Sequence, residues 1–100
     1  MAGTMGVPGA AAYCAAKHGV VGLTRTGALD YAAAGIRINA ITPGLVRTPL
    51  ITQVLGDAID NLIATRPNGR IPDPMHVASL VLWLCSPAAE FVTGEAIQIA

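Results

Sequence analysis

The stretch "AGIRINAITPG", residues 34–44, decides the fold, because a helical pattern gives way there to a strand. Gly35 follows a run of alanines and is the residue type that most often ends a helix. Over residues 36–42 the side chains alternate and are rich in β-branched types, which predicts a short strand. Pro43 and Gly44 then end that strand. The stretch predicts a helix, a strand and a loop in immediate succession.

A long helix is predicted before this strand, from about Ala10 to Ala34. Alanine favours a helix, whereas each glycine inside it costs about 1 kcal/mol relative to alanine. Apolar residues occur on nearly every face, which is typical of a helix that is covered on several sides. Before this helix, the glycines and the proline of residues 1–9 predict a loop, and their spacing does not match a dinucleotide fingerprint.

A second helix is predicted after the loop. Thr48 and Pro49 form a cap and a first-turn proline, which together mark a helix start. The residues that follow place their apolar side chains on one face from Leu50 to Ile63, so the pattern predicts a single amphipathic helix.

A third helix and a last strand complete the pattern. Asp73 and Pro74 repeat the cap-and-proline signature for a helix that ends near Cys85. A turn at residues 93–94 then leads into a strand that runs to Ala100. The alternation of helices and strands predicts an α/β fold, with a right-handed crossover between two parallel strands.

Composition restricts the class of protein. The chain is 53% hydrophobic and 12% charged, with a formal net charge of zero and scattered basic residues, which argues against a nucleic-acid partner. The uncharged stretch 77–89 is shorter than the roughly 20 residues that a membrane-spanning helix needs, and the start shows no signal peptide. Cys14 and Cys85 have neither metal-site nor disulfide spacing. We therefore expect a cytoplasmic protein with reduced thiols, no metal and no membrane partner.

Tyr13 and Lys17 are the candidate catalytic residues. Side chains four apart on a helix share one face. A free tyrosine has a pKa near 10, and a nearby cation lowers that value. A phenol tuned in this way can exchange a proton with an alcohol or carbonyl oxygen while a hydride moves at carbon, and a lysine can hold ribose hydroxyls. The spacing alone is equally met by an exposed lysine beside a half-buried tyrosine.

Several motifs in order make the chain resemble the short-chain dehydrogenase/reductase family, a Rossmann-fold group of NAD(P)-dependent oxidoreductases. The resemblance covers nearly all 100 residues. The Tyr-x-x-x-Lys motif of the family matches Tyr13 and Lys17. Its Arg-x-Asn-x-x-x-Pro-Gly motif matches residues 37–44, and its Thr-Gly pair before the last core strand matches residues 93–94.

The resemblance implies a role for each matching residue. Tyr13 would be the catalytic acid/base, and Lys17 would bind the nicotinamide ribose and lower the pKa of the phenol. The backbone of Val46 and the hydroxyl of Thr48 would meet the carboxamide of NAD or NADP, in a loop where such sheets bind ligands. Thr48 is equally a plain helix cap, and the two roles can coexist. Residues 49–73 would form a lid over a small alcohol or ketone substrate. For Arg47, a solvated position is favoured over a contact to phosphate or substrate.

The resemblance reaches only the C-terminal part of that fold. The catalytic serine of the family would fall one residue before Met1, and the phosphate-binding loop further upstream. We therefore expect residues 1–100 to form a single partial domain, the C-terminal half of a doubly wound parallel sheet without the nucleotide-binding half, inactive or very poor alone. The resemblance also implies a homo-oligomer, a tetramer or dimer, for the full-length form. The alternative is a catalytically silent truncated chain that acts only as an assembly or interaction module; membrane association through exposed apolar helices is a third reading.

Overall fold

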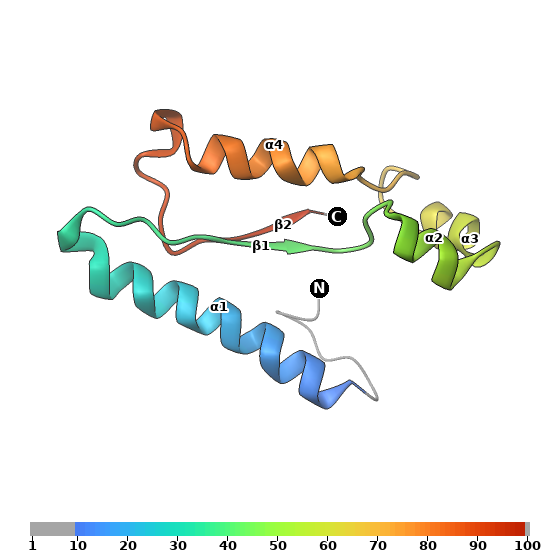
Figure 1. Cartoon of the computed structure of the whole chain (residues 1–100), viewed down its shortest axis with the longest axis horizontal. Helices are drawn as coiled ribbons and strands as arrows, with labels where there is room; N and C mark the ends of the chain where they lie inside the picture. Colours follow the sequence, from blue (N-terminus) through green and yellow to red (C-terminus); the bar gives the residue numbers. More distant parts are fainter. Residues whose placement is uncertain (1–9, 100) are drawn as a thin grey trace.

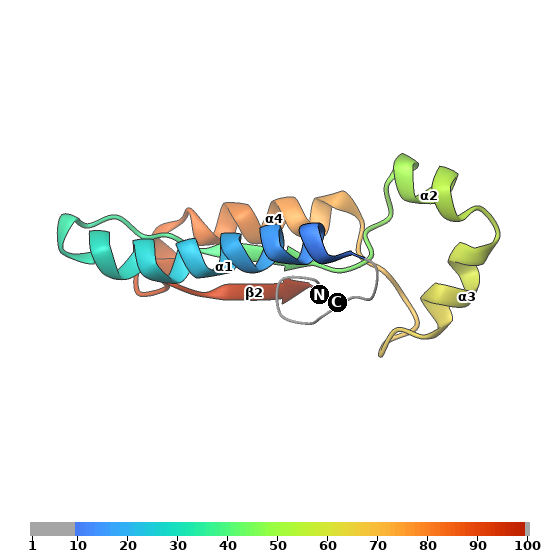
Figure 2. The same cartoon turned by 90° about the horizontal axis from the view of Figure 1, so that it is seen from below.

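The computed structural model describes residues 10–99 and arranges them in three layers (Figures 1 and 2). Helix α1 (Ala11–Tyr31) covers one face of a two-stranded sheet and helix α4 (Pro74–Leu84) covers the other. Strands β1 (Ala40–Pro43) and β2 (Ala96–Ile99) are parallel. This confirms the predicted α/β class and the parallel pairing. The loop predicted at residues 1–9 and the strand end predicted at Ala100 lie outside the described residues.

The helix predicted over residues 10–34 is confirmed. It consists of α1 and a final 3₁₀ turn, η1 (Ala32–Ala34), which Gly35 closes in a left-handed conformation (φ 76°) by donating its N–H to the carbonyl of Ala32. The face that packs toward the sheet buries three residues of α1, namely Val21, Thr24 and Ala28. The turn before β2 approaches the same face closely. A Cβ atom on Gly94 would lie 3.3 Å from the Cβ of Ala28, which is a tight contact, and the positive φ of Gly94 (74°) also disfavours a residue with a side chain.

The strand predicted over residues 36–42 is wrong at both ends, because β1 begins at Ala40 and includes Pro43. The main chain opposite residues 36–39 turns at Gly94 (φ 74°), so this part has one main-chain bond and several side-chain bonds instead of a regular ladder. Pro43 is tolerated because the main-chain donors toward β2 come from Ala40 and Gly44, at even-numbered positions. The proline nitrogen therefore faces the other edge of the strand, where it removes no bond to β2.

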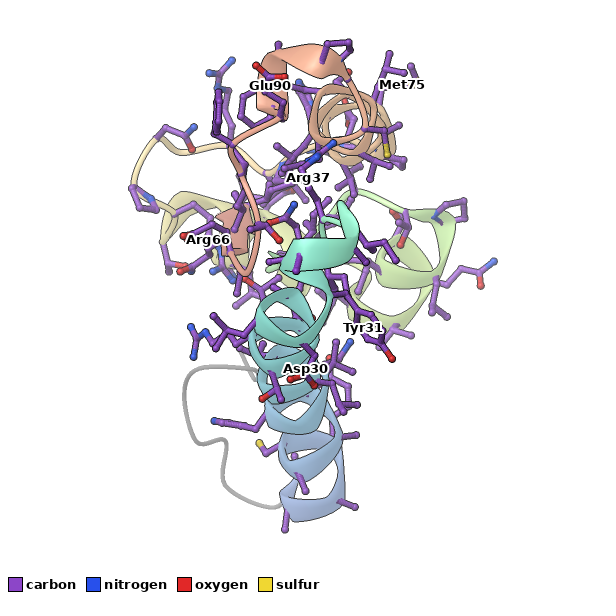
Figure 3. All side chains as sticks on the ribbon, turned by 90° about the vertical axis from the view of Figure 1, so that its left-hand side faces the viewer. Asp30, Tyr31, Arg37, Arg66, Met75 and Glu90 are labelled. Atoms are coloured by element: carbon purple, nitrogen blue, oxygen red, sulfur yellow. The ribbon has the colours of Figure 1, made fainter. Side chains whose placement is uncertain are left out.

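Arg37 and Asn39 bind β1 to the chain that precedes β2, a set of contacts that we call the Arg37–Asn39 clamp. The Arg37 guanidinium donates to the carbonyl of Leu84 at 2.7 Å and to that of Val92 at 3.2 Å. The Asn39 amide donates to the Val92 carbonyl at 3.0 Å and accepts from the Glu95 N–H at 3.2 Å. Figure 3 shows Arg37 between the α1 and α4 layers.

The clamp also joins two motifs that stand far apart in the sequence. The Thr93 hydroxyl accepts from the N–H of Ile38 at 3.1 Å, and the N–H of Gly94 donates to the Ile38 carbonyl at 2.8 Å. Because Leu84 is the last residue of α4, Arg37 also places a positive charge at a helix C-terminus, where it is favourable. The Arg-x-Asn and Thr-Gly motifs are thus two sides of one contact.

The single helix predicted between Leu50 and Ile63 is wrong. The structure has two helices there, α2 (Pro49–Leu55) and α3 (Ala58–Ala64). The break falls at Gly56, whose backbone (φ 52°, ψ −129°) lies where residues with a side chain are strained. An apolar stripe with helical period cannot reveal such a break, because the stripe continues across it. The helix predicted over 74–85 is confirmed as α4, and a short 3₁₀ turn, η2 (Pro87–Ala89), follows it.

The described part of the chain buries little of its apolar surface. Its Cα radius of gyration is 15.5 Å, compared with about 13 Å for a compact domain of this length. Large apolar side chains are exposed on the outer faces of both helical layers, including Leu23 (76%) and Leu29 (82%) on α1 and Leu82 (74%) on α4. Exposed apolar surface of this extent is rare on a monomeric soluble protein.

We predict that Asn39→Ala destabilises the fold by about 1–3 kcal/mol, because it removes two hydrogen bonds that each contribute about 0.5–1.5 kcal/mol. Asn61→Ala is the matched control, since Asn61 is exposed on α3. Urea unfolding followed by circular dichroism measures both. Equal losses in the two variants would contradict a structural role for the Asn39 amide.

Candidate functional site

Tyr13 and Lys17 lie together on the first turns of α1. The Lys17 Nζ is 5.3 Å from the centroid of the Tyr13 ring, which is within the range of a cation–π contact. Tyr13 is 56% exposed, and within residues 10–99 its hydroxyl has no hydrogen-bond partner. The predicted pairing of the two side chains on one helix face is therefore present, and the phenol oxygen is open to a ligand.

The loop that follows β1 carries the other predicted binding residues, Val46 and Thr48. Thr48 is the N-cap of α2, and its hydroxyl oxygen accepts the N–H of Ile51 at 3.2 Å. The capping role is thus present in the structure. This bond uses one lone pair of the Thr48 hydroxyl oxygen, so the hydroxyl hydrogen remains available to donate to a ligand. Val46 is half-buried in the same loop.

The two parts of the candidate site lie at the same end of the sheet. In Figures 1 and 2 the amino end of α1, which holds Tyr13, is at the end of the molecule where β1 leads into α2. Because β1 and β2 are parallel, both carboxyl ends point to this edge. The crevice outside the carboxyl ends of the strands is where open α/β sheets bind ligands.

His18 and Cys14 are the neighbours of the pair on α1. The ring of His18 donates from Nδ1 to the Cys14 carbonyl at 2.7 Å, which ties it to its own helix. Cys14 and Cys85 are both free thiols.

In the part of the chain that the structure describes, no three His, Cys, Asp or Glu side chains come close enough to hold a metal ion. Residues 10–99 also hold no helix with the length and apolar character needed to cross a bilayer.

Arg47 and Asp73 join the two ends of the segment that holds α2 and α3, a contact that the sequence reasoning did not predict. The Arg47 N–H donates to the Pro72 carbonyl at 2.8 Å, and the Arg47 Nε is 3.7 Å from a carboxylate oxygen of Asp73. The one sequence feature that could have indicated this contact is the opposite charge of the residues at the two ends of the predicted lid. The contact holds the loop of Val46 and Thr48 against the start of α4.

The N-terminus of α4 shows a second unexpected contact. His76 is exposed in the first turn of α4. Its Nδ1 also accepts the N–H of Asp73 at 2.8 Å, so this histidine takes the part that a glutamate or glutamine plays in a capping box.

Comparison with known proteins adds independent information. A family model described as "Enoyl-(Acyl carrier protein) reductase" matches residues 1–100. The chain is 46% identical over 102 residues to the 2,5-dichloro-2,5-cyclohexadiene-1,4-diol dehydrogenase of Sphingobium indicum, a match that spans 95% of this chain and 39% of the relative. It is also 46% identical over 95 residues to the cyclohexanol dehydrogenase of an Acinetobacter strain, again with 95% of this chain but 37% of the relative. The chain thus spans about two fifths of the length of these relatives.

Solved structures agree. An actinorhodin polyketide ketoreductase variant with NADPH superposes with a TM-score of 0.87 at 38% identity, over 98% of this chain and 42% of that one. The 4-hydroxyisoleucine dehydrogenase with NADH gives a TM-score of 0.88 at 33% identity, over 98% of this chain and 41% of that one. With the family match over the whole sequence, these likenesses show that the chain belongs to the short-chain dehydrogenase/reductase family, with its Rossmann-like α/β fold.

Proposed function

We propose that this chain forms the nicotinamide side of the active site of an NAD(P)-dependent oxidoreductase that interconverts a small alcohol and a ketone. The observation that carries the proposal is the Tyr13–Lys17 pair, with an open hydroxyl and an ammonium 5.3 Å from the ring centroid. Family membership supports it, as do the names of the relatives, which are dehydrogenases and reductases. The cofactor is NAD or NADP, the two kinds that occur in the solved relatives.

The polar groups of the site are free to meet such a ligand. Within the described residues, Lys17 has no acidic partner, the Tyr13 hydroxyl has no hydrogen bond, and the Thr48 hydroxyl hydrogen is unused. Lys17 would hold the ribose hydroxyls, while the Val46 backbone and the Thr48 hydroxyl would hold the carboxamide. The bound nicotinamide accepts or gives a hydride at carbon.

Tyr13 is the proposed acid/base. In the oxidative direction its phenolate takes the hydroxyl proton of the alcohol as the hydride leaves the carbon, and in the reductive direction its phenol returns that proton to the carbonyl oxygen. The ammonium of Lys17, one helical turn away, stabilises the phenolate through its positive charge. Lys17 keeps its positive charge throughout, and only the oxygen of Tyr13 gains or loses a proton.

The remaining parts of the site belong to the portion of the relatives that this chain does not match. We propose that residues 1–100 are one partial domain, the C-terminal half of a doubly wound sheet, with residues 49–73 as the substrate lid. The pyrophosphate site, the catalytic serine and the strands next to β1 would come from the unmatched portion. Within the described residues, β1 pairs only with β2, so its other edge is open to such strands.

The same features support proposals for the oligomeric state, the location and the partner of the enzyme. The exposed apolar side chains on α1 suit a homo-oligomer, a dimer or tetramer, in the full-length form. The free thiols suit a cytoplasmic location. The partner at the site is a small alcohol or ketone rather than nucleic acid or membrane, in line with the zero net charge.

An alternative function is favoured by one observation. The outer faces of α1 and α4 expose more large apolar side chains than a free-standing domain of this size would tolerate. A catalytically silent chain that serves only as an assembly or interaction module would show the same surface.

We predict that Tyr13→Phe lowers kcat by about 10²–10⁴-fold, because it removes the group that exchanges the proton. The assay host is a hybrid in which the part of the Acinetobacter cyclohexanol dehydrogenase that precedes the matched region is joined to this chain. Tyr31→Phe, at the other end of α1, is the matched control and should stay near the parent rate. Undiminished turnover in Tyr13→Phe would remove the basis of the proposal.

For Thr48 the prediction separates capping from cofactor binding. In the same hybrid, Thr48→Val should raise the KM for the cofactor about tenfold by losing one hydrogen bond to it, and should also speed hydrogen exchange at the Ile51 N–H. Thr48→Ser keeps the hydroxyl and should change neither. Faster exchange with an unchanged KM would show that Thr48 is a cap and nothing more.

The isolated 100-residue chain is expected to turn over no ketone at ordinary enzyme rates, about 1–10³ s⁻¹. It should still change NADH fluorescence at high concentration, because Lys17, Val46 and Thr48 are present. A silent interaction module should give no nicotinamide-dependent signal. Full-rate turnover by the chain alone would contradict the proposed division of the site.

A further inference from the structure

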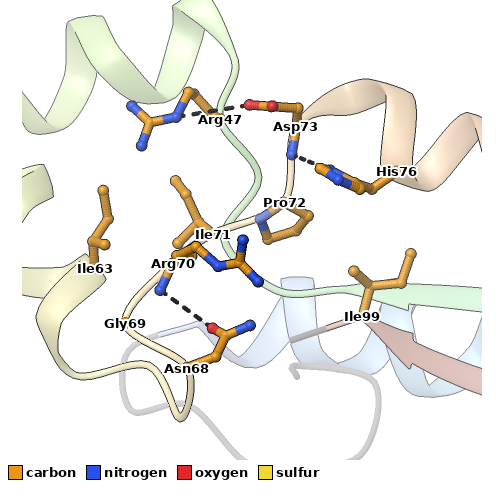
Figure 4. A pocket seen from close by; sticks show the side chains of 10 residues that line it. All are labelled: Arg47, Ile63, Asn68, Gly69, Arg70, Ile71, Pro72, Asp73, His76 and Ile99. Carbon is orange, nitrogen blue, oxygen red and sulfur yellow. Dashed lines mark hydrogen bonds and ion pairs between the residues drawn. The ribbon is translucent and has the colours of Figure 1, made fainter.

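A pocket lies next to the segment that holds α2 and α3, at the point where the two ends of this segment meet (Figure 4). It has a volume of about 460 Å³ and lies between the loop before α2, the α3–α4 connection and the start of α4. Its apolar lining includes Ile71, which is buried, and Ile99 at the carboxyl end of β2. None of the residues assigned above to proton transfer or cofactor binding lines it.

The charged side chains of this pocket are predominantly basic. Arg47 and Arg70 line it, and Asp73 is the one acidic residue among the lining side chains. Asp73 engages Arg47 only through Nε, at 3.7 Å, which leaves the two terminal nitrogens of that guanidinium without a carboxylate. No acidic side chain within residues 10–99 pairs with Arg70. The pocket therefore holds more positive charge than its own residues neutralise.

Two further contacts orient donors at the same place. The Nδ1 of His76 accepts the Asp73 N–H, so a neutral ring carries its hydrogen on Nε2, where it is free to donate. The side-chain oxygen of Asn68 accepts the Arg70 N–H at 3.2 Å and fixes the turn from which Arg70 extends. Figure 4 shows Arg47, Arg70 and His76 around the pocket, each from a different element.

We propose that this pocket binds a small organic anion, a carboxylate or phosphate monoester on a compact aliphatic body. Guanidinium groups recognise both kinds of oxyanion through paired hydrogen bonds. The isoleucines supply the apolar surface that an aliphatic body needs, and the volume lies at the lower end of the range for small-molecule sites. The proposal does not depend on the chemistry of Tyr13, because neither Tyr13 nor Lys17 lines the pocket, although part of the lining belongs to the lid proposed above.

Binding is tested directly on the full 100-residue chain, without cofactor or turnover. Cyclohexanecarboxylate, its uncharged isostere cyclohexanecarboxamide and inorganic phosphate are titrated separately at constant ionic strength. The backbone amide NMR shifts of Gly69, Arg70 and Ile71 report on the pocket. Saturable shifts with the carboxylate, and none with the carboxamide, are expected. Saturation by phosphate as well would show that the oxyanion is the recognised group; saturation by the carboxylate alone would assign the site to carboxylates.

Three variants distinguish the pocket from a general charge effect. Arg70→Gln should weaken carboxylate binding about tenfold, because it removes a charged hydrogen-bond donor. Arg25→Gln, an exposed arginine on α1 outside the pocket, makes the same charge change and should leave binding unaltered. Asp73→Asn should tighten binding, up to about fivefold, because it releases Arg47 from an exposed ion pair.

Opposite effects from Arg70→Gln and Asp73→Asn cannot arise from a shared loss of structure. Equal shifts with carboxylate and carboxamide would overturn the proposal, and this comparison needs no variant. An Arg70→Gln loss no larger than that of Arg25→Gln would overturn it too. Neither outcome would affect the proposed oxidoreductase, since Tyr13 and Lys17 do not line this pocket.

Discussion

The Arg37–Asn39 clamp holds the described structure together. Two paired strands of four residues each are not stable on their own, because so short a sheet has few hydrogen bonds and little buried surface. The clamp adds side-chain bonds from Arg37 and Asn39 to the carbonyls of Leu84 and Val92, which tie the entry of β1 to the end of α4. Both faces of the sheet are then covered, by α1 and by α4. The register of the two strands follows from this one set of contacts.

The clamp lies at the opposite end of the strands from the candidate site, and it determines that site indirectly. With the amino ends of β1 and β2 fixed, their carboxyl ends deliver Gly44 and Ile99 to the same edge, where the N–H of Gly44 donates to the Ile99 carbonyl at 2.9 Å. The loop of Val46 and Thr48 starts there. Arg47 then holds this loop against Pro72 and Asp73. Tyr13 stands in the first turn of α1, so its position depends on the packing of that helix against the sheet.

The large exposed apolar surface is consistent with a chain that matches only part of the length of its relatives. The chain matches about two fifths of each relative, and the described residues bury few large side chains. In the function proposed above, α1 and the β1 loop would supply groups for the nicotinamide end, and the pyrophosphate site would come from protein outside the described residues.

The sequence by itself determined the features that depend on near neighbours. The helix over 10–34, the caps at Thr48 and Asp73, and the shared face of Tyr13 and Lys17 follow from helix periodicity and from the chemistry of adjacent residues. Those features were predicted correctly, and the fold class followed from their order. The roles of the site residues rest on family resemblance and remain predictions.

Only the tertiary structure decided where β1 begins and where the helix predicted from Leu50 to Ile63 breaks. It also decided what Arg37, Asn39, Arg47 and His76 bind. The bond partners of Arg37 and Asn39 stand 47 to 56 residues away, so no local pattern records them. β1 begins at Ala40 because the chain opposite turns at Gly94, a constraint that residues 36–39 do not carry themselves. Sequence periodicity reports which face of an element is apolar, whereas the contacts that place two elements together depend on chain that is distant in sequence.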